Sequence, residues 1–483
     1  MEVPEQTLDA SKSLKDEGNK LFQEGHYEKA LEMYTKAIEC IGKTHKLAAI
    51  YLSNKAQCEI LLEQYGIAVS DSLEAIEADP SYFKAYYRLA VAYTNLGKLK
   101  EAVSALESLK KSLGSNSGPE IETKLRSLRQ LKKERDFFAS FQYQAQDVII
   151  DEKDLVIEES YHGLTVEEDC ILDAEWIQKL IEYLRDQKRL HKKYLWRILK
   201  KVKSILEAEK NINDIKIEDP MVQVTVCGDV HGQFYDLLNI FSMNGLPTPE
   251  KPYVFNGDFV DRGSFSVEVV LLLFALKISS PRSIFLNRGN HENSDMNKLY
   301  GFEGEVIHKY CSKTFEIFMS VFNILPLAML ISKKIFILHG GLFQQENVKL
   351  TDIQKLNRTG PIPSGGIMCD ALWADPGADM GRKANMRGVS LEFGPDVTKK
   401  FLEDNDLSLM IRSHQVKEEG YEITHNNQLI TVFSAPKYCD SMTNKGAYII
   451  FKADLKPHIV QFQAVPHPNI PAMAYARGGG MLR

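Results

Sequence analysis

Three short blocks rich in glycine and polar residues, evenly spaced along the chain, constrain the fold more than any other feature. They read GDVHG at Gly228–Gly232, GDFVDRG at Gly257–Gly263 and RGNHE at Arg288–Glu292, and each follows a short apolar run. Such spacing is typical of strand, helix, strand units with one polar block at the end of each strand. Because ligands gather at the carboxyl ends of strands in open α/β sheets, we expect these polar side chains to converge at one sheet edge.

The side chains in these blocks predict metal-assisted chemistry. They are carboxylates, imidazoles and an amide: Asp229, His231, Asp258, Asn290 and His291. Such groups bind divalent ions such as Mn, Fe, Zn or Mg, and Asp258 has two oxygens with which to bridge two ions. Two ions about 3.5–4 Å apart clamp a phosphoryl group and lower the pKa of a shared water. Two divalent ions are therefore the predicted cofactors, and their identity stays open.

The same blocks contain groups suited to a phosphate ester. Arg262 and Arg288 carry guanidinium forks that match phosphate oxygens. His291 follows Asn290 and is the natural general acid for a leaving alkoxide. The alternative is that the GD and GN dipeptides are ordinary turns and the histidines ordinary loop residues. That alternative explains one block well, but it does not explain three blocks in order at even spacing.

Later residues supply the groups that are still missing. His339 and His414 each end an apolar run, KKIFILH and LMIRSH, and are able to complete the shell of the second ion. Arg387 in RGVSLEFG is a third arginine, and Tyr438 in TVFSAPKYCD adds an aromatic ring and a hydroxyl to the pocket wall. A lone histidine at a strand end is usually structural, but here two ligands are missing and the context recurs.

Residues 11–110 contain an internal repeat. Small residues recur at matching positions of three copies: Gly18, Ala56 and Ala90, and twelve positions later Ala30, Ala68 and Ala102. The last two copies are 34 positions apart, and a helix-pair repeat needs such small residues where its helices cross. The stretch resembles three tetratricopeptide repeats. Stacks of this kind form a concave groove that binds peptides.

Five side chains in the repeats match, residue by residue, the carboxylate clamp that holds the EEVD-type C-termini of heat-shock protein 90-type chaperones. They are Lys15, Asn19, Asn54, Lys84 and Arg88. Two lysines, an arginine and two amides suit the terminal carboxylate and the last aspartate of such a peptide. The alternative, solvated side chains on a helical face, explains any one lysine but explains all five less well.

Composition limits the class of protein. A chain of 483 residues that is 44% hydrophobic and 26% charged is typical of a globular protein with two or three domains. A net charge of −6 provides no positive field to attract nucleic acid, and no apolar run approaches the length of a membrane span. Seven cysteines without a CxxC pair are typical of a reducing compartment. We expect the cytoplasm, with the nucleus as a second location.

Taken together, GDVHG, GDFVDRG, RGNHE, HGG and SAPKYCD resemble the catalytic core of the phosphoprotein phosphatase family, which acts on phosphoserine and phosphothreonine. The resemblance covers about residues 160–470, and it is closest to members with N-terminal tetratricopeptide repeats. It implies a multidomain fold, an all-α repeat superhelix followed by an α/β metallophosphoesterase domain with a central β-sandwich flanked by helices. The expected boundaries are 1–110 for three repeats, 111–160 for a capping helix and linker, 161–470 for the catalytic domain and 471–483 for a C-terminal tail.

The resemblance also implies residue roles. The first ion would be held by Asp229, His231 and Asp258, and the second by Asp258, Asn290, His339 and His414. His291 would donate a proton and be oriented by Asp261. Phosphate would be held by Arg262, Arg288 and Arg387, with Tyr300 and Tyr438 nearby. The implied mechanism is direct attack by metal-bound hydroxide, with no phosphoenzyme.

Regulation is a further implication. In the resembled members the repeat domain and a C-terminal helix close the active-site channel, and a chaperone tail or an acidic lipid activates. Glu63 matches a contact for that closure, but Leu61 stands where the family carries arginine, and the glycines of the tail ARGGGMLR disfavour a helix. We therefore expect weakened closure. Lys437 and Gln415 stand where the family usually has Asn and Glu, which bears on peptide selectivity.

Three hypotheses for function follow. The first is a metal-dependent protein serine/threonine phosphatase acting on phosphoprotein substrates. The second is an adaptor that uses the repeat groove and carries a decayed phosphatase scaffold, and the presence of every implied ligand argues against it. The third is another metallophosphoesterase, such as a nuclease or nucleotide hydrolase. The FVDRGSFSVE and SAPKYCD segments and the net acidity favour the first.

Overall fold

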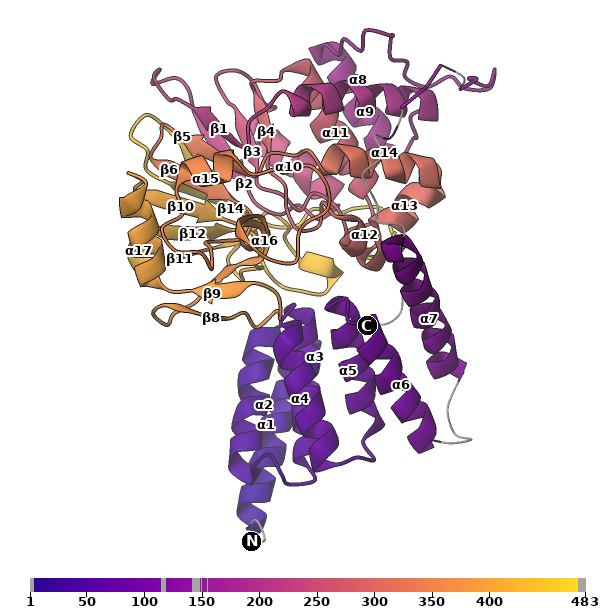
Figure 1. Cartoon of the computed structure of the whole chain (residues 1–483), viewed down its shortest axis with the longest axis vertical. Coiled ribbons are helices and arrows are strands. Elements are labelled where there is room, and N and C mark those ends of the chain that lie inside the picture. Colours follow the sequence, from indigo (N-terminus) through magenta and orange to yellow (C-terminus); the bar gives the residue numbers. More distant parts are fainter. Residues whose placement is uncertain (1–3, 114–118, 141–147, 149, 154, 477–483) are drawn as a thin grey trace.

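The computed structural model of the chain describes residues 4–113, 119–140, 148, 150–153 and 155–476. A helical N-terminal domain packs end-on against a larger domain of two sheets and flanking helices (Figure 1). Six helices form three antiparallel pairs in the N-terminal domain: α1 (Glu5–Gln23), α2 (Tyr27–Ile41), α3 (Ala48–Leu61), α4 (Tyr65–Ala78), α5 (Phe83–Asn95) and α6 (Leu99–Leu113). Each helix contacts the next one along the chain, so the predicted repeat superhelix is confirmed.

The small residues of the repeat lie where helices cross. Ala30, Ala56 and Ala68 are fully buried. At Gly18 an added Cβ would come within 2.8 Å of the Tyr34 ring, so only glycine lets α1 approach α2 this closely. Helix α7 (Pro119–Ser140) packs on α6 after the third pair, in the region where a capping helix was predicted.

Two sheets form the centre of the larger domain. One sheet has the order β1-β5-β6-β10-β12-β11 and the other the order β14-β13-β2-β3-β4, and a small third sheet has the order β7-β9-β8. The strands are β1 (Ile212–Ile215), β2 (Val224–Cys227), β3 (Tyr253–Phe255), β4 (Ile284–Leu286), β5 (Ala328–Ile331), β6 (Ile335–Leu338), β7 (Asp375–Pro376), β8 (Arg382–Ala384), β9 (Leu391–Phe393), β10 (Leu409–Arg412), β11 (Tyr421–Thr424), β12 (Leu429–Val432), β13 (Gly446–Phe451) and β14 (His458–Phe462).

An apolar layer fills the space between the two large sheets. Val226 and Val254 of one sheet pack in a single buried cluster with Ile337, Ile411 and Ile430 of the other. This arrangement buries the β-branched runs that precede the polar blocks, because strands covered on both faces read as continuous apolar segments. The expected β-sandwich is therefore present.

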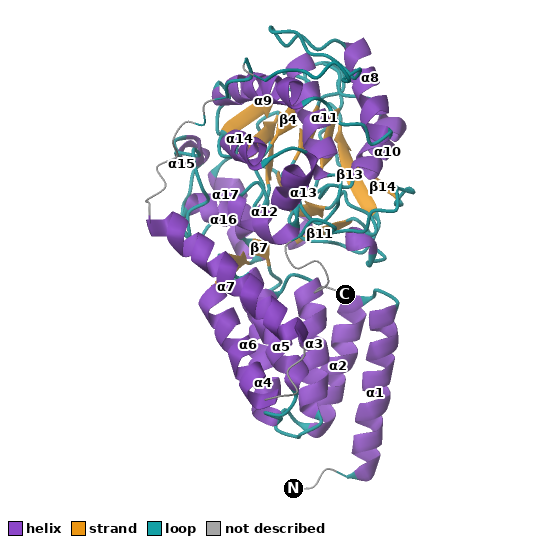
Figure 2. Ribbon diagram, turned by 90° about the vertical axis from the view of Figure 1, so that its right-hand side faces the viewer, coloured by secondary structure: helices purple, strands orange, loops and turns teal. Residues whose placement is uncertain are grey.

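Helices cover both outer faces of the sandwich (Figure 2). They are α8 (Ala174–Arg185), α9 (Lys192–Glu207), α10 (Phe234–Asn244), α11 (Ser266–Ser279), α12 (Ser294–Tyr300), α13 (Phe302–Lys309), α14 (Ser312–Phe322), α15 (Leu350–Gln354), α16 (Ile367–Trp373) and α17 (Pro395–Asp404). Helix α11 is buried along nearly its whole length, which explains the continuous apolar run LLLFAL. In the part of the chain that is described, none of the helices has the length and apolarity of a membrane span.

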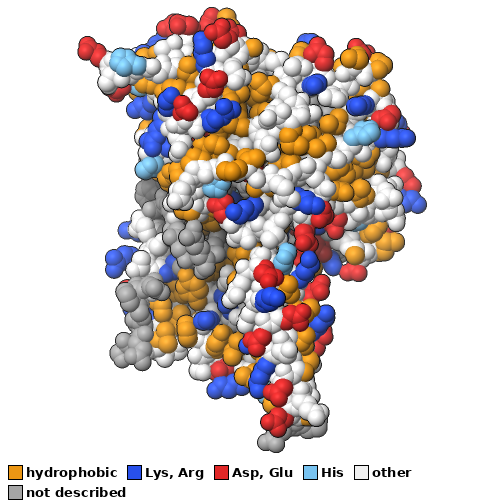
Figure 3. Space-filling view, turned by 180° about the vertical axis from the view of Figure 1, so that it is seen from behind, with side chains coloured by type: hydrophobic (Ala, Val, Ile, Leu, Met, Phe, Trp, Pro, Cys, Tyr) orange, Lys and Arg blue, Asp and Glu red, His pale blue; other side chains and the backbone are white. Residues whose placement is uncertain are grey.

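The C-terminal segment returns to the catalytic domain. The Met473 N–H donates to the Arg262 carbonyl at 2.7 Å, and Ser264 Oγ donates to the Pro471 carbonyl at 2.7 Å. Residues 477–483, whose glycines are expected to disfavour a helix, lie outside the described residues. On the face in Figure 3, acidic and basic side chains are intermingled over both domains, as expected of a chain with a small net charge.

Candidate active site

The predicted ligands converge because each follows the end of a strand. Strands β2, β3 and β4 are neighbouring and parallel, so Asp229, Asp258 and Asn290 emerge at one edge. His339 and His414 follow β6 and β10, which are parallel neighbours in the facing sheet. Each of these turns is sharp, and His231, Asp258 and His414 have φ values of 40°, 52° and 69°. Non-glycine residues rarely adopt this conformation, and it is concentrated at functional sites.

The side chains form one buried cluster around Asp258. Its Oδ2 atom lies 3.6 Å from His231 Nε2 and 3.3 Å from His339 Nε2. His339 Nε2 is also 2.8 Å from Asn290 Oδ1, and Asp229 Oδ2 is 3.8 Å from His231 Nε2. Each of these residues is at most 2% exposed. The central position of Asp258 is the one expected for a ligand that bridges two ions.

The cluster separates into two groups of candidate ligand atoms. His231 and Asp258 form one group with His291, and Asp258 forms the other with His339 and His414, and within each group the atoms lie within 4.8 Å of one another. The first group contains His291 where the resemblance implied Asp229. His291 has its other ring nitrogen engaged elsewhere, so its presence beside the cluster agrees with a proton donor next to the ions.

Burial and mutual charge shift the titration of this cluster. Burial raises the pKa of Asp229 to about 7 and lowers the pKa of His231 to about 4. For His339 burial acts to lower the pKa, but the Asp258 carboxylate outweighs it and raises the pKa to about 9. Perturbed groups gathered in one place are typical of functional sites.

Glu292 fixes the loops that present these ligands. Its carboxylate accepts hydrogen bonds from the main-chain N–H groups of Asp258 at 2.8 Å, Phe259 at 2.8 Å and Gly289 at 2.7 Å. It therefore ties the block after β3 to the block after β4. Glu292 lies in the RGNHE block, but the sequence pattern alone predicts no role for it.

His291 is held by an acidic partner. Its Nδ1 atom lies 2.8 Å from Asp261 Oδ2, and the same oxygen accepts a 2.8 Å hydrogen bond from Asn297 Nδ2. Burial opposes protonation, but Asp258 and Asp261 outweigh it and raise the pKa of His291 above its usual range. The geometry agrees with the predicted orientation of His291 by Asp261. Asn297 is an additional support that the sequence did not reveal.

Two of the three predicted arginines face one point. Arg262 stacks on the Tyr300 ring at 3.8 Å, and Arg387 is anchored by Asp375, with 2.7 Å between Nε and Oδ2. Tyr438 lies beside them and contacts the His231 ring, with centroids 5.2 Å apart. Together they form a basic, aromatic wall beside the metal-ligand cluster.

Arg288 does not join this wall, contrary to the predicted phosphate contact. It is fully buried, and its Nη1 donates to the carbonyls of Arg358 and Gly360 at 3.3 and 2.9 Å. Its Nη2 donates to Asn323 Oδ1 at 2.9 Å. Because these donors are consumed by loops of the scaffold, the guanidinium supports the fold and does not reach a substrate.

A carboxylate of the repeat domain fills the point that the arginines face. Glu63, in the turn after α3, places Oε1 at 2.5 Å from Arg262 Nη2 and Oε2 at 3.0 Å from Arg387 Nη1. The Tyr438 hydroxyl donates to Glu63 Oε1 at 3.1 Å. Burial acts to raise the pKa of Glu63, but Arg262 and Arg387 outweigh it and lower the pKa to about 2. Glu63 is therefore ionised in this position.

Neighbouring residues of the repeats extend the contact. Tyr65 Oη lies 2.9 Å from Arg262 Nη2 and 3.0 Å from Tyr300 Oη, which is also 3.1 Å from Asn95 Oδ1. At the start of α4, the N–H groups of Gly66 and Ile67 both donate to one carbonyl of the catalytic domain, that of Met386, at 2.8 and 3.2 Å. Free N–H groups at a helix start need such acceptors.

Leu61 has a different effect from the one we expected. It packs, together with Leu62, against a cluster that includes Tyr34 and Cys58 of the repeats and Met442 of the catalytic domain. An arginine here would add a polar contact, whereas leucine adds apolar burial to the same junction. The expectation of weaker closure from Leu61 therefore lacks structural support.

The residues of the predicted peptide clamp lie on helices α1, α3 and α5 of the repeats. Arg88 on α5 donates from Nη1 to Ser53 and to Asn54 Oδ1, the latter at 3.3 Å. Asn54 Nδ2 in turn donates to Asn19 Oδ1 at 3.2 Å. Lys84 is exposed one turn from Arg88, and Lys15 pairs with Asp16 on α1. The amides and Arg88 thus form one polar network, with the lysines beside it.

The comparisons with known proteins agree with this architecture. A family model described as calcineurin-like phosphoesterase matches residues 222–418, one described as PPP5 TPR repeat region matches residues 125–214, and one described as tetratricopeptide repeat matches residues 73–104. Human serine/threonine-protein phosphatase 5 is 44% identical over 474 residues, which cover 97% of this chain and 93% of the human protein. Serine/threonine-protein phosphatase T of Aspergillus oryzae is 44% identical over 479 residues, which cover 98% of each chain.

A solved structure described as a protein serine/threonine phosphatase from Saccharomyces cerevisiae, with similarity to human phosphatase PP5, aligns with a TM-score of 0.61 and 41% identity. It covers 63% of this chain and all of its own. Fold and site thus define a metallophosphoesterase joined to tetratricopeptide repeats, an enzyme of the hydrolase class. The chain belongs to the serine/threonine-protein phosphatase 5 family.

Proposed function

We propose that this phosphatase hydrolyses phosphoserine and phosphothreonine in proteins with two divalent ions, and that its own repeat domain inhibits it until a partner binds. One observation carries the proposal. The Glu63 carboxylate, an anion with oxygens spaced like those of a phosphate, sits between Arg262 and Arg387 and receives the Tyr438 hydroxyl. We infer that the phosphate of a substrate takes this position when Glu63 leaves it.

The residues present fit a pair of divalent ions. His414 Nε2 is buried and has no hydrogen-bond partner among the described residues. A buried polar atom normally has a partner, and a metal ion would supply one here. The donor set consists of imidazole, carboxylate and amide groups, which suits Mn, Fe, Zn or Mg. Asp229, His231 and Asp258 would hold one ion, and Asp258, Asn290, His339 and His414 the other. Such ions would neutralise part of the phosphate charge and lower the pKa of bound water toward about 7.

The arginines position the phosphoryl group. Arg262 is fixed by the Tyr300 ring at 3.8 Å, and Arg387 is fixed by Asp375 and by the His414 carbonyl, which accepts from its Nη2 at 2.7 Å. Because both guanidinium groups are held before a substrate arrives, little ordering is needed on binding. Their positive charge favours the anionic transition state in a buried site.

His291 supplies the proton for the leaving oxygen of serine or threonine. Asp261 holds Nδ1, which leaves Nε2 as the atom that donates. The same carboxylate stabilises the charged imidazole, and Asn297 and the Phe302 N–H, at 2.8 and 2.9 Å, keep that carboxylate in place. A general acid of this kind typically contributes a factor of about 10²–10⁴ in rate.

Closure by the repeat domain would inhibit the enzyme by occupying the phosphate position. Glu63 and Tyr65 both accept hydrogen bonds from Arg262 Nη2, and the Met386 carbonyl accepts the N–H groups at the start of α4. A phosphoprotein has to displace these contacts before its phosphate reaches the arginines. The repeat groove, with Lys84 and Arg88, would bind the EEVD-like C-terminus of a heat-shock protein 90-type chaperone, and acidic lipids are a further proposed activator.

The test is hydrolysis of phosphoserine peptides by the full chain, with Mn added or with a chelator. Activity that requires the ion, and that rises when the repeats are removed, is the expected result. Activity that is insensitive to the chelator would contradict the metal assignment. Equal rates with and without the repeats would contradict inhibition by closure.

A further inference from the structure

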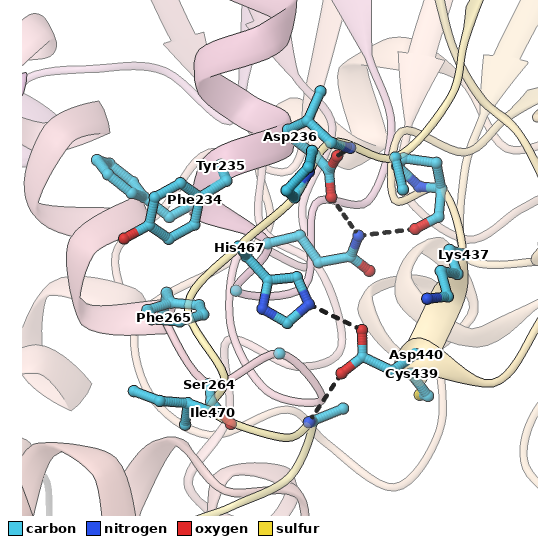
Figure 4. A pocket seen from close by; sticks show the side chains of 18 residues that line it. Phe234, Tyr235, Asp236, Ser264, Phe265, Lys437, Cys439, Asp440, His467 and Ile470 are labelled. Atoms are coloured by element: carbon cyan, nitrogen blue, oxygen red, sulfur yellow. Dashed lines mark hydrogen bonds and ion pairs between the residues drawn. The ribbon is translucent and has the colours of Figure 1, made fainter. Parts of the chain in front are cut away.

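A cavity of about 400 Å³ opens beside the phosphate site (Figure 4). Gly232 and Gly263, which line it, directly follow the predicted ligand His231 and the arginine Arg262. All of its described lining residues lie between Gly232 and Ala472, so no described residue of the repeat domain lines it. The cavity therefore adjoins the loops that carry His231 and Arg262, and Glu63 is not among the residues that line it.

The wall of the cavity is largely apolar and aromatic. Tyr235 and Phe265 form one side, with ring centroids 5.2 Å apart in an edge-to-face contact. Pro436 and Ile470 line the cavity as well. Such a wall holds the aliphatic part of a peptide by contact area.

The acidic groups of the cavity are already engaged. Asp236 accepts hydrogen bonds from Gln233 Nε2 at 2.7 Å and from the Val465 N–H at 2.9 Å. Asp440 pairs with His467 Nε2 at 3.0 Å and accepts a main-chain N–H of the C-terminal segment at 3.1 Å. Each of the four carboxylate oxygens therefore has a donor, and these groups do not call for a basic ligand.

Lys437 differs from them. Its side chain is exposed at the cavity rim, and none of the ion pairs found among the described residues involves its ammonium group (Figure 4). Its backbone is fixed in the left-handed region, at φ 48°, because its N–H donates to the Asn444 carbonyl at 2.8 Å and its own carbonyl accepts the Asp440 N–H at 3.0 Å. The lysine thus extends from a firm anchor with its charge available to a ligand.

We propose that this cavity is a substrate subsite in which Lys437 selects phosphoproteins with an acidic side chain close to the phosphorylated residue. The next residue, Tyr438, places its hydroxyl on the carboxylate that stands in the phosphate position. Consecutive Cα atoms are about 3.8 Å apart. When the phosphate of a peptide contacts Tyr438, a peptide residue within roughly three positions of the phosphorylated one therefore lies beside Lys437. The inference rests on the proposed function, because the subsite serves the same phosphopeptide.

The test compares phosphoserine peptides that differ at one position. Glu, Ala or Lys is placed at each of the three positions on either side of the phosphoserine, and kcat/KM is measured for the full chain with Mn. The wild type, Lys437→Asn and Lys437→Glu are compared. Lys452→Glu is the matched control, because it is an exposed lysine after β13 that does not line the cavity.

The expected preference of the wild type for Glu over Ala is about two- to fivefold at one or more positions, the size of an exposed ion pair. In Lys437→Asn the ratio falls to about one, and in Lys437→Glu the peptide with Lys becomes the better substrate. Lys452→Glu keeps the wild-type ratio, and added salt reduces the preference. Since each ratio is taken within one variant, a general change in rate does not affect it.

Two results would overturn the inference alone: hydrolysis of all peptides without any preference for charge, or a preference that persists unchanged in Lys437→Asn. Failure to hydrolyse any phosphoserine peptide, with p-nitrophenyl phosphate still hydrolysed, would overturn the proposed function and this inference with it. The two failures are therefore distinguishable in one set of measurements.

Discussion

Replacement of Glu63 by glutamine tests whether one carboxylate holds the active site closed. Glutamine keeps the size and one acceptor oxygen of the side chain but removes the charge that faces Arg262 and Arg387. The pKa of Glu63 falls from its ordinary value of 4.5 to about 2 in the closed protein. At about 1.36 kcal/mol per pKa unit, the ionised carboxylate stabilises closure by about 3 kcal/mol. The side chain is only 15% exposed, so solvent screens little of this.

A loss of about 3 kcal/mol corresponds to a factor of roughly 150 in the closing equilibrium. We expect the basal rate of Glu63→Gln to rise toward that of a chain that begins at residue 155 and lacks the repeats. Glu39→Gln is the matched control, since Glu39 is an exposed glutamate on α2 away from the interface. Initial rates on one phosphopeptide, with Mn saturating, provide the measurement.

The pH dependence of the same variant adds a second check. A carboxylate with a depressed pKa stabilises closure fully above its ordinary pKa and loses that effect as the pH falls toward the folded value. The ratio of the Glu63→Gln rate to the wild-type rate should be constant from about pH 8 to pH 5.5. Below about pH 4.5 it should decline toward one, because the wild-type side chain then becomes protonated as well.

Two outcomes would refute this reasoning. If Glu63→Gln has the wild-type rate while the chain without repeats is much faster, the apolar junction around Leu61 and Met442 holds the site closed and the carboxylate does not. If the ratio of rates changes between pH 8 and pH 6, another titrating group controls closure. Unaltered peptide binding by the variant would exclude unfolding of the repeats as an explanation.

Four further variants test other parts of the protein. His291→Asn should lower kcat by about 10²–10⁴-fold and keep its metal, whereas Asp258→Asn should also lose metal. Elemental analysis after dialysis measures the metal content, and equal metal loss in both variants would contradict the separate roles. Lys84→Glu should abolish binding of a peptide that ends in EEVD, and unchanged affinity by calorimetry would remove the clamp assignment. Gly66→Val should raise the basal rate, because its Cβ would meet a main-chain carbonyl at 2.7 Å; an unchanged rate would show that the junction adapts.

The metal-ligand cluster could be predicted because its geometry follows from local pattern. Each ligand comes directly after an apolar run that forms a strand, and parallel neighbours place their ends at one edge. The repeat helices were predictable for a similar reason, since small residues recur at the period of a helix pair. In both cases the signal is local, because the apolar run before each ligand and the small residues of each repeat are recognised in short stretches of sequence.

Other features could not be predicted because their partners are distant in sequence. Arg288 looked like a phosphate ligand from its motif, but Asn323, Arg358 and Gly360 take its donors. At Leu61 the sequence shows only the loss of the polar contact that an arginine would make, because its apolar neighbours across the junction come together only in the folded chain. The cavity at Lys437 combines segments more than 200 residues apart, so no spacing rule reveals it.

Whether a chaperone peptide alone opens the enzyme depends on what closure does to the groove. Among the described residues, Arg88 and Asn54 bond only to side chains of the repeats, and no hydrogen bond or ion pair joins Lys84 to the catalytic domain. A ligand shifts an equilibrium only by its difference in affinity for the two states. Because the groove carries no contact that closure adds or removes, the difference should be small.

To overcome about 3 kcal/mol a ligand would need to bind the open state roughly 150-fold more tightly. We therefore expect a short EEVD peptide to bind the wild type and Glu63→Gln with nearly equal Kd, and to stimulate the wild type only weakly. By reciprocity, a peptide that binds Glu63→Gln much more tightly would have to open the wild type by the same factor. Calorimetry on the two proteins decides between these cases. Equal affinity would mean that activation requires contacts of the chaperone body outside the groove.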